Sequence, residues 1–272
     1  MPLFDTHAHY FDEKFGTTEE QERLLSEVMR EVPHIINCGI TPETSRLCLE
    51  WAKRHAGLFA ACGLHPENIT DSRRENNRML DEISSMLEDP KCVALGEIGL
   101  DYYWTSDNKQ EQKYVFSAQT DIALEKGLPV IIHDREAHGD CLDVVSSYRG
   151  RGLRGVFHSF SGSPETAAEL VRLGYYISFS GVITFKNALK PSQVLKVVPP
   201  DRILSETDCP YLAPVPYRGK VNDSRLMRYT VEKMAQVKGV SYGEMVEITE
   251  KNAFSLFDKC GARRIGSEGS EL

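Results

Sequence analysis

The sequence predicts an α/β protein of one domain in which eight parallel strands and their return helices close into a (β/α)8 barrel. Short apolar, β-branched runs alternate with longer amphipathic stretches along almost the whole chain, a pattern typical of repeated strand–helix units. No GxGxxG loop follows the first apolar run, although an open, doubly wound sheet would usually have one there. The length of 272 residues also suits a single barrel.

The eight apolar runs are the predicted strands, and they cover residues 2–7, 34–38, 58–62, 92–97, 129–133, 155–158, 175–179 and 202–206. The amphipathic stretches between and after them are the predicted helices, at residues 19–32, 42–55, 74–87, 109–126, 138–148, 164–173, 191–197, 224–237 and 242–257. Two helix starts carry a clear signal, because a capping Thr41 or Ser163 precedes a proline at the first helical position.

The barrel domain is expected to span residues 1–260, followed by a flexible C-terminal tail at residues 261–272. The last ten residues contain Gly, Ser and charged residues without apolar periodicity. Such a segment has little to pack against the domain, so we expect it to be frayed.

Composition limits the kind of partner and compartment. A net charge of −8 argues against a broad basic surface for nucleic acid, so any bound DNA would be anchored by metal ions and local basic loops. The seven cysteines are scattered and form no CxxC pair, which indicates neither a disulfide framework nor a thiolate zinc site. With no signal or membrane segment at the N-terminus, we expect a cytoplasmic protein.

The main chemical signal is a set of His, Glu and Asp residues at the ends of five predicted strands. His7 and His9 follow the first strand, and strand alternation places both on one face. Glu97 ends the otherwise apolar fourth strand, where an unpaired charge would be costly. The other members end or follow later strands, and they are His133, His158 and Asp208.

Taken singly, each of these residues has an ordinary structural explanation. Glu97 could pair with an Arg or Lys of the barrel, and any one histidine could be a hydrogen-bonded side chain. The carboxyl ends of barrel strands converge at one face, however, and active sites form there. The set as a whole therefore predicts a metal site.

Imidazoles with carboxylates suit Zn, Mn or Fe(II), and Mg when more oxygen ligands join. Six candidate ligands exceed what one tetrahedral ion takes, which favours two divalent ions that share a bridging carboxylate. Glu97 is the expected bridge. Asp208 is expected to orient a metal-activated water and take its proton, so these two residues are the predicted catalytic carboxylates.

The motifs around these residues resemble, in order and spacing, the TatD family of metal-dependent deoxyribonucleases. They are Phe4-Asp5-Thr6-His7-Ala8-His9, Gly63-Leu64-His65-Pro66, Gly96-Glu97-Ile98-Gly99-Leu100-Asp101-Tyr102, His133-Asp134-Arg135, His158-Ser159-Phe160-Ser161-Gly162 and Glu206-Thr207-Asp208-Cys209-Pro210-Tyr211-Leu212. The resemblance implies an amidohydrolase-like barrel and 3′ to 5′ exonuclease action on single-stranded DNA, with RNA as a further candidate substrate. It also implies divalent metals, Mg, Mn or Zn, held by all six ligands named above.

Three further residues are candidate substrate or supporting groups near the metals. Arg135 lies two residues beyond His133, should share its face, and could grip phosphate with its planar fork. His65 ends the third strand and could contact a phosphate or the leaving group. Glu206 could support a metal ligand. A salt bridge for Arg135, a hydrogen-bonded core position for His65 and internal pairing for Glu206 are the alternatives.

The loop after the eighth strand carries an aromatic ring and two basic side chains. Single strands bind through base stacking and backbone charge, so Tyr217, Arg218 and Lys220 are candidates for a substrate groove. The ordinary alternative is a charged surface loop.

Two other functions fit the same residues. A metal-dependent amide or ester hydrolase, such as a D-aminoacyl-tRNA deacylase, would use the same fold and ligands. A noncatalytic binding scaffold could keep the barrel and lose turnover. No membrane partner is expected, and a monomer is the working assumption.

Overall fold

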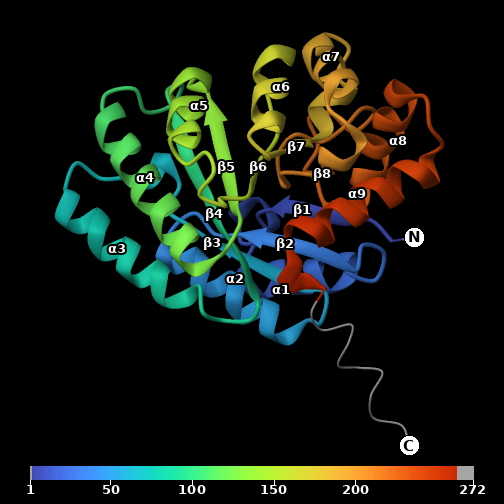
Figure 1. Ribbon diagram of the computed structural model, residues 1–272. Coiled ribbons are helices and arrows are strands. Elements are labelled where there is room, and N and C mark those ends of the chain that lie inside the picture. Colours follow the sequence, from blue (N-terminus) through green and yellow to red (C-terminus); the bar gives the residue numbers. More distant parts are fainter. Residues whose placement is uncertain (1, 262–272) are drawn as a thin grey trace, which may run out of the picture.

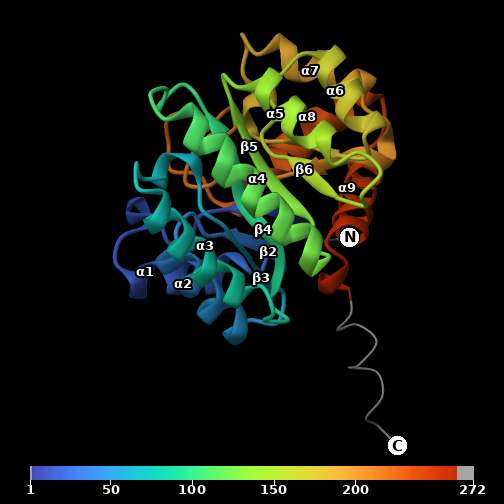
Figure 2. The ribbon, with the colours of Figure 1, turned by 60° about the vertical axis from the view of Figure 1, so that its left-hand side comes forward.

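The computed structural model describes residues 2–261, and it contains the predicted barrel. Eight parallel strands form one sheet in the order β1-β2-β3-β4-β5-β6-β7-β8, and Figures 1 and 2 show them inside a ring of helices. All but the first residue of the predicted tail, residues 261–272, lies outside the described residues. Among the described helices, none is long and apolar enough to cross a membrane.

The strands are β1 (Phe4–Ala8), β2 (His34–Cys38), β3 (Leu58–Cys62), β4 (Cys92–Asp101), β5 (Val130–Arg135), β6 (Gly155–Phe157), β7 (Tyr176–Phe179) and β8 (Ile203–Ser205). The α-helices are α1 (Thr18–Val28), α2 (Pro42–Arg54), α3 (Arg73–Met86), α4 (Lys109–Lys126), α5 (His138–Ser147), α6 (Pro164–Arg172), α7 (Leu189–Val197), α8 (Met227–Lys238) and α9 (Tyr242–Leu256). Each predicted strand and helix therefore has an observed counterpart.

Helix boundaries follow local capping chemistry. The Thr41 side chain accepts a hydrogen bond from the amide of Thr44, and Ser163 does the same for Thr166, so both predicted helix starts are confirmed. The helix α7 begins at Leu189, two residues earlier than predicted. Pro191 lies in its first turn, where the missing N–H has no helical partner to lose.

The strand β4 is longer than predicted, and the expectation that Glu97 ends it was wrong. Residues 98–101 continue the strand and pair with residues 132–135 of β5. Gly99 permits this continuation, because its φ is +141° and a Cβ there would lie 2.0 Å from the carbonyl oxygen of His133. Glu97 is therefore a mid-strand residue with four more strand residues beyond it.

Irregular pairing marks the strands that carry His7 and Glu97. Between Asp5 and Ala8, β1 advances three residues while β2 advances two, from Ile35 to Asn37. The same extra residue occurs in β4 between Leu95 and Ile98, opposite residues 130–132 of β5. Bulges of this kind bend a strand and re-aim its side chains, and they are common next to active sites.

The barrel closes between β1 and the segment after β8. The backbone N–H of His9 donates to the carbonyl of Cys209 at 2.8 Å, and the N–H of Asp208 donates to the carbonyl of His7 at 3.0 Å. The buried Asp5 carboxylate adds to this seam, because it accepts from the amide of Thr207 and the hydroxyl of Ser224 at 2.9 and 2.6 Å. The seam therefore places His7 beside Asp208.

A buried amide fastens α9 to the start of β8, and it gives a test of the fold. The side-chain nitrogen of Asn252 donates to the carbonyls of Pro200 and Ile203 at 2.7 and 2.8 Å. Asn252→Ala removes both hydrogen bonds, including the buried one to the Ile203 carbonyl, and should lower the free energy of unfolding by about 1–3 kcal/mol. Urea denaturation measures this change. The matched control is Asn77→Ala at an exposed position, which should change the free energy of unfolding by less than about 0.5 kcal/mol. An equal loss of stability in both variants would contradict the role of Asn252 in fastening α9 to β8.

Candidate metal centre

All six predicted ligands meet at the carboxyl ends of the strands. Within the described residues, three groups have ligand atoms within 4.8 Å of one another, and they are His7 with Glu97 and His158, His7 with His9 and Asp208, and His65 with Glu97 and His133. The side chains come from β1, β4, β5 and the residues that follow β1, β3, β6 and β8. They are buried or half-buried, so water has limited access to the cluster.

Glu97 lies at the centre of the cluster, and its two oxygens face different imidazoles. Oε2 lies 3.2 Å from Nε2 of His7 and 3.4 Å from Nε2 of His9. Oε1 lies 2.8 Å from both Nδ1 of His133 and Nε2 of His158. Each oxygen of this one carboxylate therefore lies next to a different pair of imidazole nitrogens.

Asp208 completes the first pair from the other side of the seam. Its Oδ1 lies 3.4 Å from Nε2 of His9 and 3.7 Å from Nε2 of His7. The Asp208 backbone has a φ of +55°, a left-handed conformation that is uncommon outside glycine and concentrates at functional sites. Hydrogen bonding of its amide to His7 holds this conformation.

The hydrogen bond of His9 fixes which of its nitrogens can bind a cation. Nδ1 lies 2.8 Å from the carbonyl oxygen of Cys38. A carbonyl only accepts, so Nδ1 must carry the hydrogen. In neutral His9 the lone pair is therefore on Nε2, which faces Glu97 and Asp208.

Two carboxylates orient the imidazoles of His133 and His158 in the same way. Nε2 of His133 lies 2.9 Å from Oδ2 of Asp101, and Nδ1 of His158 lies 3.2 Å from Oε1 of Glu206. Each carboxylate accepts the N–H hydrogen of its histidine. In the neutral ring the opposite nitrogen then carries a lone pair that faces Glu97. Such outer carboxylates typically orient metal-binding histidines. Lone pairs and carboxylate oxygens that converge in this way repel one another unless a cation lies between them, so the residues fit a divalent metal.

His65 has the opposite arrangement. Its Nδ1 accepts a hydrogen bond from the backbone amide of Glu67 at 3.2 Å, so in the neutral ring the hydrogen is on Nε2. That nitrogen lies 3.4 Å from Oε1 of Glu97. Although His65 is close enough to share an ion with Glu97 and His133, its hydrogen bonding makes it a donor. The contact of His65 with phosphate or a leaving group stays a prediction.

Close contacts among imidazoles and carboxylates shift the pKa values of the cluster. Burial opposes ionisation of Glu97, but the charges of His158, His65 and His7 outweigh it and hold its pKa well below the usual range. Burial opposes charging of His133 as well, yet its hydrogen bonds to Asp101 and Glu97 raise its pKa to about 9. Positive charge on the surrounding imidazoles therefore favours the ionised form of Glu97.

Asp101 is a site residue that the sequence analysis quoted in a motif without assigning it a role. Its Oδ2 orients His133, and its Oδ1 accepts from the backbone amides of Tyr103 and Trp104 at 2.9 and 2.8 Å. The signal was present in the sequence, because Glu97, Gly99 and Asp101 have the alternation of one strand face.

The remaining predicted substrate residues lie outside the metal cluster at the same end of the barrel, Arg135 at the end of β5 and the other three in the loop after β8. The exposed Arg135 guanidinium lies 4.2 Å from the centre of the Tyr103 ring. Arg218 lies 4.5 Å from the Phe185 ring. Tyr217 and Lys220 are exposed, and the Tyr217 ring packs against Tyr229 at 5.3 Å. All four side chains are exposed, so they are available at the surface.

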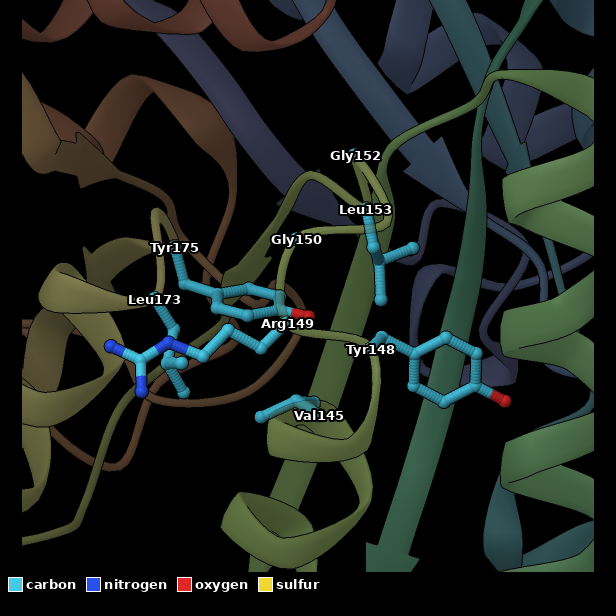
Figure 3. Close-up of a pocket in the computed structure, with 8 residues that line it drawn as sticks. All are labelled: Val145, Tyr148, Arg149, Gly150, Gly152, Leu153, Leu173 and Tyr175. Carbon is cyan, nitrogen blue, oxygen red and sulfur yellow. The ribbon is translucent and has the colours of Figure 1, made fainter.

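A pocket of about 340 Å³ lies at the other end of the molecule (Figure 3). Its lining comes from the connections that lead from α5 to β6 and from α6 to β7, including Tyr148, Arg149 and Tyr175. These connections precede strands, whereas the metal cluster follows them. The pocket is therefore separate from the cluster.

A (β/α)8 barrel that gathers imidazoles and carboxylates at the carboxyl ends of its strands has the architecture of a metal-dependent hydrolase. Comparison with known proteins agrees with this class. The chain belongs to the family described as TatD related DNase, whose model matches residues 4–258. The resemblance seen in the sequence motifs is confirmed over nearly the full chain.

Individual relatives support the same assignment. The uncharacterized metal-dependent hydrolase YabD of Bacillus subtilis (strain 168) is 39% identical over 257 residues, covering 94% of this chain and 98% of the relative. The uncharacterized metal-dependent hydrolase YcfH of Escherichia coli (strain K12) is 41% identical over 259 residues, covering 94% and 96%. The crystal structure of YJJV, a TatD homolog from Escherichia coli K12, superposes with a TM-score of 0.83 at 29% identity, covering 94% of this chain and 98% of that one. This chain is a metal-dependent hydrolase.

The raised pKa of His133 predicts how metal affinity depends on pH. Below a pKa of about 9 the imidazole holds a proton that a metal ion must displace, so metal binding should release protons and tighten as the pH rises from about 6 to about 9. Calorimetric titration with Mn²⁺ or Zn²⁺ in buffers of different ionisation enthalpy measures the protons released. An affinity that stays constant across this range, with no proton release, would contradict the assignment of His133 as a ligand.

Proposed function

We propose that this hydrolase is a deoxyribonuclease that cleaves phosphodiester bonds of DNA, acting from the 3′ end of single strands. The observation that carries the proposal is the position of Glu97, whose two oxygens each face a separate pair of imidazole nitrogens. A carboxylate in that position suits a bridge between two cations, an arrangement common in enzymes that cleave phosphodiesters. The family description as TatD related DNase supports the same substrate.

The first cation would be held by His7, His9 and Asp208 together with Oε2 of Glu97. The second would be held by His133 and His158 together with Oε1 of Glu97. Nitrogen-rich sets of this kind suit Zn or Mn, and Mg where water supplies further oxygen ligands. When bound, such ions lower the pKa of water and neutralise charge that develops on phosphate oxygens.

Asp208 is suited to orient the attacking water and accept its proton. Burial opposes its ionised form, but the hydrogen bond with His9 and the charges of His158 and His7 outweigh burial and hold the pKa of the carboxyl below its usual range. An ionised Asp208 can therefore act as an acceptor near neutral pH. The half-buried carboxylate also remains reachable for a small molecule such as water.

His65 is suited to hold the substrate phosphate. Its Nε2 hydrogen points toward the same Glu97 oxygen that faces His133 and His158. A donor in that position can pair with a phosphate oxygen or with the departing 3′ oxygen as charge builds there. Glu206 would act through His158, by fixing the orientation of the ring.

The outer contacts would come from basic and aromatic residues around the metal centre. Arg135 at the end of β5 is exposed, and so are Tyr217, Arg218 and Lys220 in the loop after β8, at the same end of the barrel. Because the chain has a net charge of −8, these local groups and the metal ions would supply the attraction for phosphate. RNA offers the same phosphates, so it remains a further candidate substrate. The free, buried cysteines suit action in the reducing cytoplasm.

Replacing the shared carboxylate tests the proposal directly. Glu97→Gln keeps the side-chain size but removes the charge that both cations would share, so nuclease activity should fall by at least about 100-fold. The protein is first loaded with Mg²⁺, Mn²⁺ or Zn²⁺. The assay then follows the stepwise shortening of a 5′-labelled single-stranded oligonucleotide. The matched control is Glu125→Gln, because Glu125 is exposed on α4, and this variant should keep full activity. Equal activity in both variants would remove the support for the shared carboxylate.

The same experiment separates DNA hydrolysis from the other hydrolytic function open to this site. A D-aminoacyl-tRNA is assayed beside the oligonucleotide, with chelator and with each metal restored. Metal-dependent loss of oligonucleotide is the expected result. Deacylation without any nuclease activity would replace the deoxyribonuclease by an ester hydrolase built on the same ligands.

A further inference from the structure

We propose that Tyr103, Trp104 and Arg135 form a stacking platform for an unpaired base of the nucleic-acid substrate beside the metal centre. The platform deepens the proposed nuclease function and rests on it. It assigns a place to the base next to the phosphate that is cut, and it gives a physical reason for a single-stranded substrate.

The two aromatic rings of the platform are open to solvent. Tyr103 is 56% exposed and Trp104 is 61% exposed. The two rings lie edge to face in the loop between β4 and α4, with centres 4.7 Å apart and planes at 85°. The Arg135 guanidinium lies 4.2 Å from the Tyr103 ring centre and 5.3 Å from that of Trp104. Aromatic rings that remain more than half exposed beside a cation form a surface that suits a ligand with both a π face and negative charge.

A single carboxylate ties the platform to the metal centre. Oδ1 of Asp101 accepts from the backbone amides of Tyr103 and Trp104, and Oδ2 of the same residue orients His133. Asp101 and Arg135 are also direct partners in the β4–β5 ladder. The platform therefore starts two residues from a side chain that contacts a proposed metal ligand.

A buried glutamine makes the platform loop rigid. The side chain of Gln112 from α4 accepts from the amide of Asp101 at 2.9 Å and donates to the carbonyls of Asp101 and Thr105 at 3.0 and 2.6 Å. These bonds fix the backbone on both sides of the two rings. Little ordering entropy would then be lost when a base stacks on them.

The chemistry of the platform favours a nucleobase as its occupant. Every base has a π face that an aromatic ring can stack on, and the phosphate next to it would meet the charge of Arg135. A purely apolar partner would gain nothing from the guanidinium. Bases inside a duplex are already stacked and paired, so only a single strand or a frayed end can offer a free face.

Intrinsic fluorescence tests binding without requiring turnover. The chain has two tryptophans, of which Trp51 is 1% exposed and Trp104 is 61% exposed. Adding a single-stranded DNA oligonucleotide in the presence of chelator should quench the Trp104 emission, and Trp104→Phe should abolish the quenching. An abasic oligonucleotide, which has the same phosphates without bases, should cause no quenching. Quenching by both oligonucleotides alike would overturn the platform.

Kinetics with metal restored give a second, independent readout. Trp104→Ala and Tyr103→Ala should each raise KM for the normal oligonucleotide by about tenfold, as expected for loss of one stacking contact, with kcat changed much less. Both variants should cleave an abasic oligonucleotide as the parent protein does. The matched control is Tyr242→Ala, which removes a 43% exposed ring at the start of α9 and should leave KM unchanged.

The outcomes separate the platform from the proposed function. Base-dependent quenching in a protein that hydrolyses no DNA with any metal would keep the binding site and reject the deoxyribonuclease. DNA hydrolysis with unchanged KM in both platform variants would reject the platform and keep the deoxyribonuclease. An equal rise in KM for normal and abasic strands would also reject base stacking.

Discussion

A buried carboxylate that needs positive charge on both sides is the constraint on which this structure depends. Glu97 is 3% exposed and lies within 3.4 Å of nitrogens from five imidazoles. An isolated ionised carboxylate in such a position would be very costly. The surrounding imidazoles hold the pKa of its carboxyl well below the usual range, and divalent ions would supply the positive charge in the enzyme. The arrangement around Glu97 therefore suits cations on both sides of its carboxylate.

The barrel meets this constraint by placing each donor on a different strand. Parallel pairing brings all carboxyl ends of the strands to one face, and bulges near His7 and Glu97 adjust their directions. The seam between β1 and the segment after β8 brings Asp208 to His7 through a backbone hydrogen bond. The left-handed backbone of Asp208 shows that local conformation is strained to complete the site.

Much of this arrangement could be predicted from the sequence, because it follows from periodicity. Alternation placed His7 and His9 on one face, and their Nε2 atoms lie 3.0 Å apart. Strand order placed Glu97, His133, His158 and Asp208 at one end of the barrel.

Other features depend on contacts between distant segments and could not be predicted in this way. The extension of β4 through Gly99 requires pairing with β5, which the apolar pattern does not show. The donor role of His65 depends on one backbone amide, that of Glu67. The exposed pair Tyr103 and Trp104 lies in a loop, where no periodicity signals orientation.

The most direct test of the account is the location of bound metal. Crystals grown with Mn²⁺ and measured for anomalous scattering should show two peaks, one on each side of Glu97. The first should contact His7, His9 and Asp208, and the second should contact His133 and His158. A single peak that leaves one Glu97 oxygen without a cation, or no peak at this face of the barrel, would contradict the account.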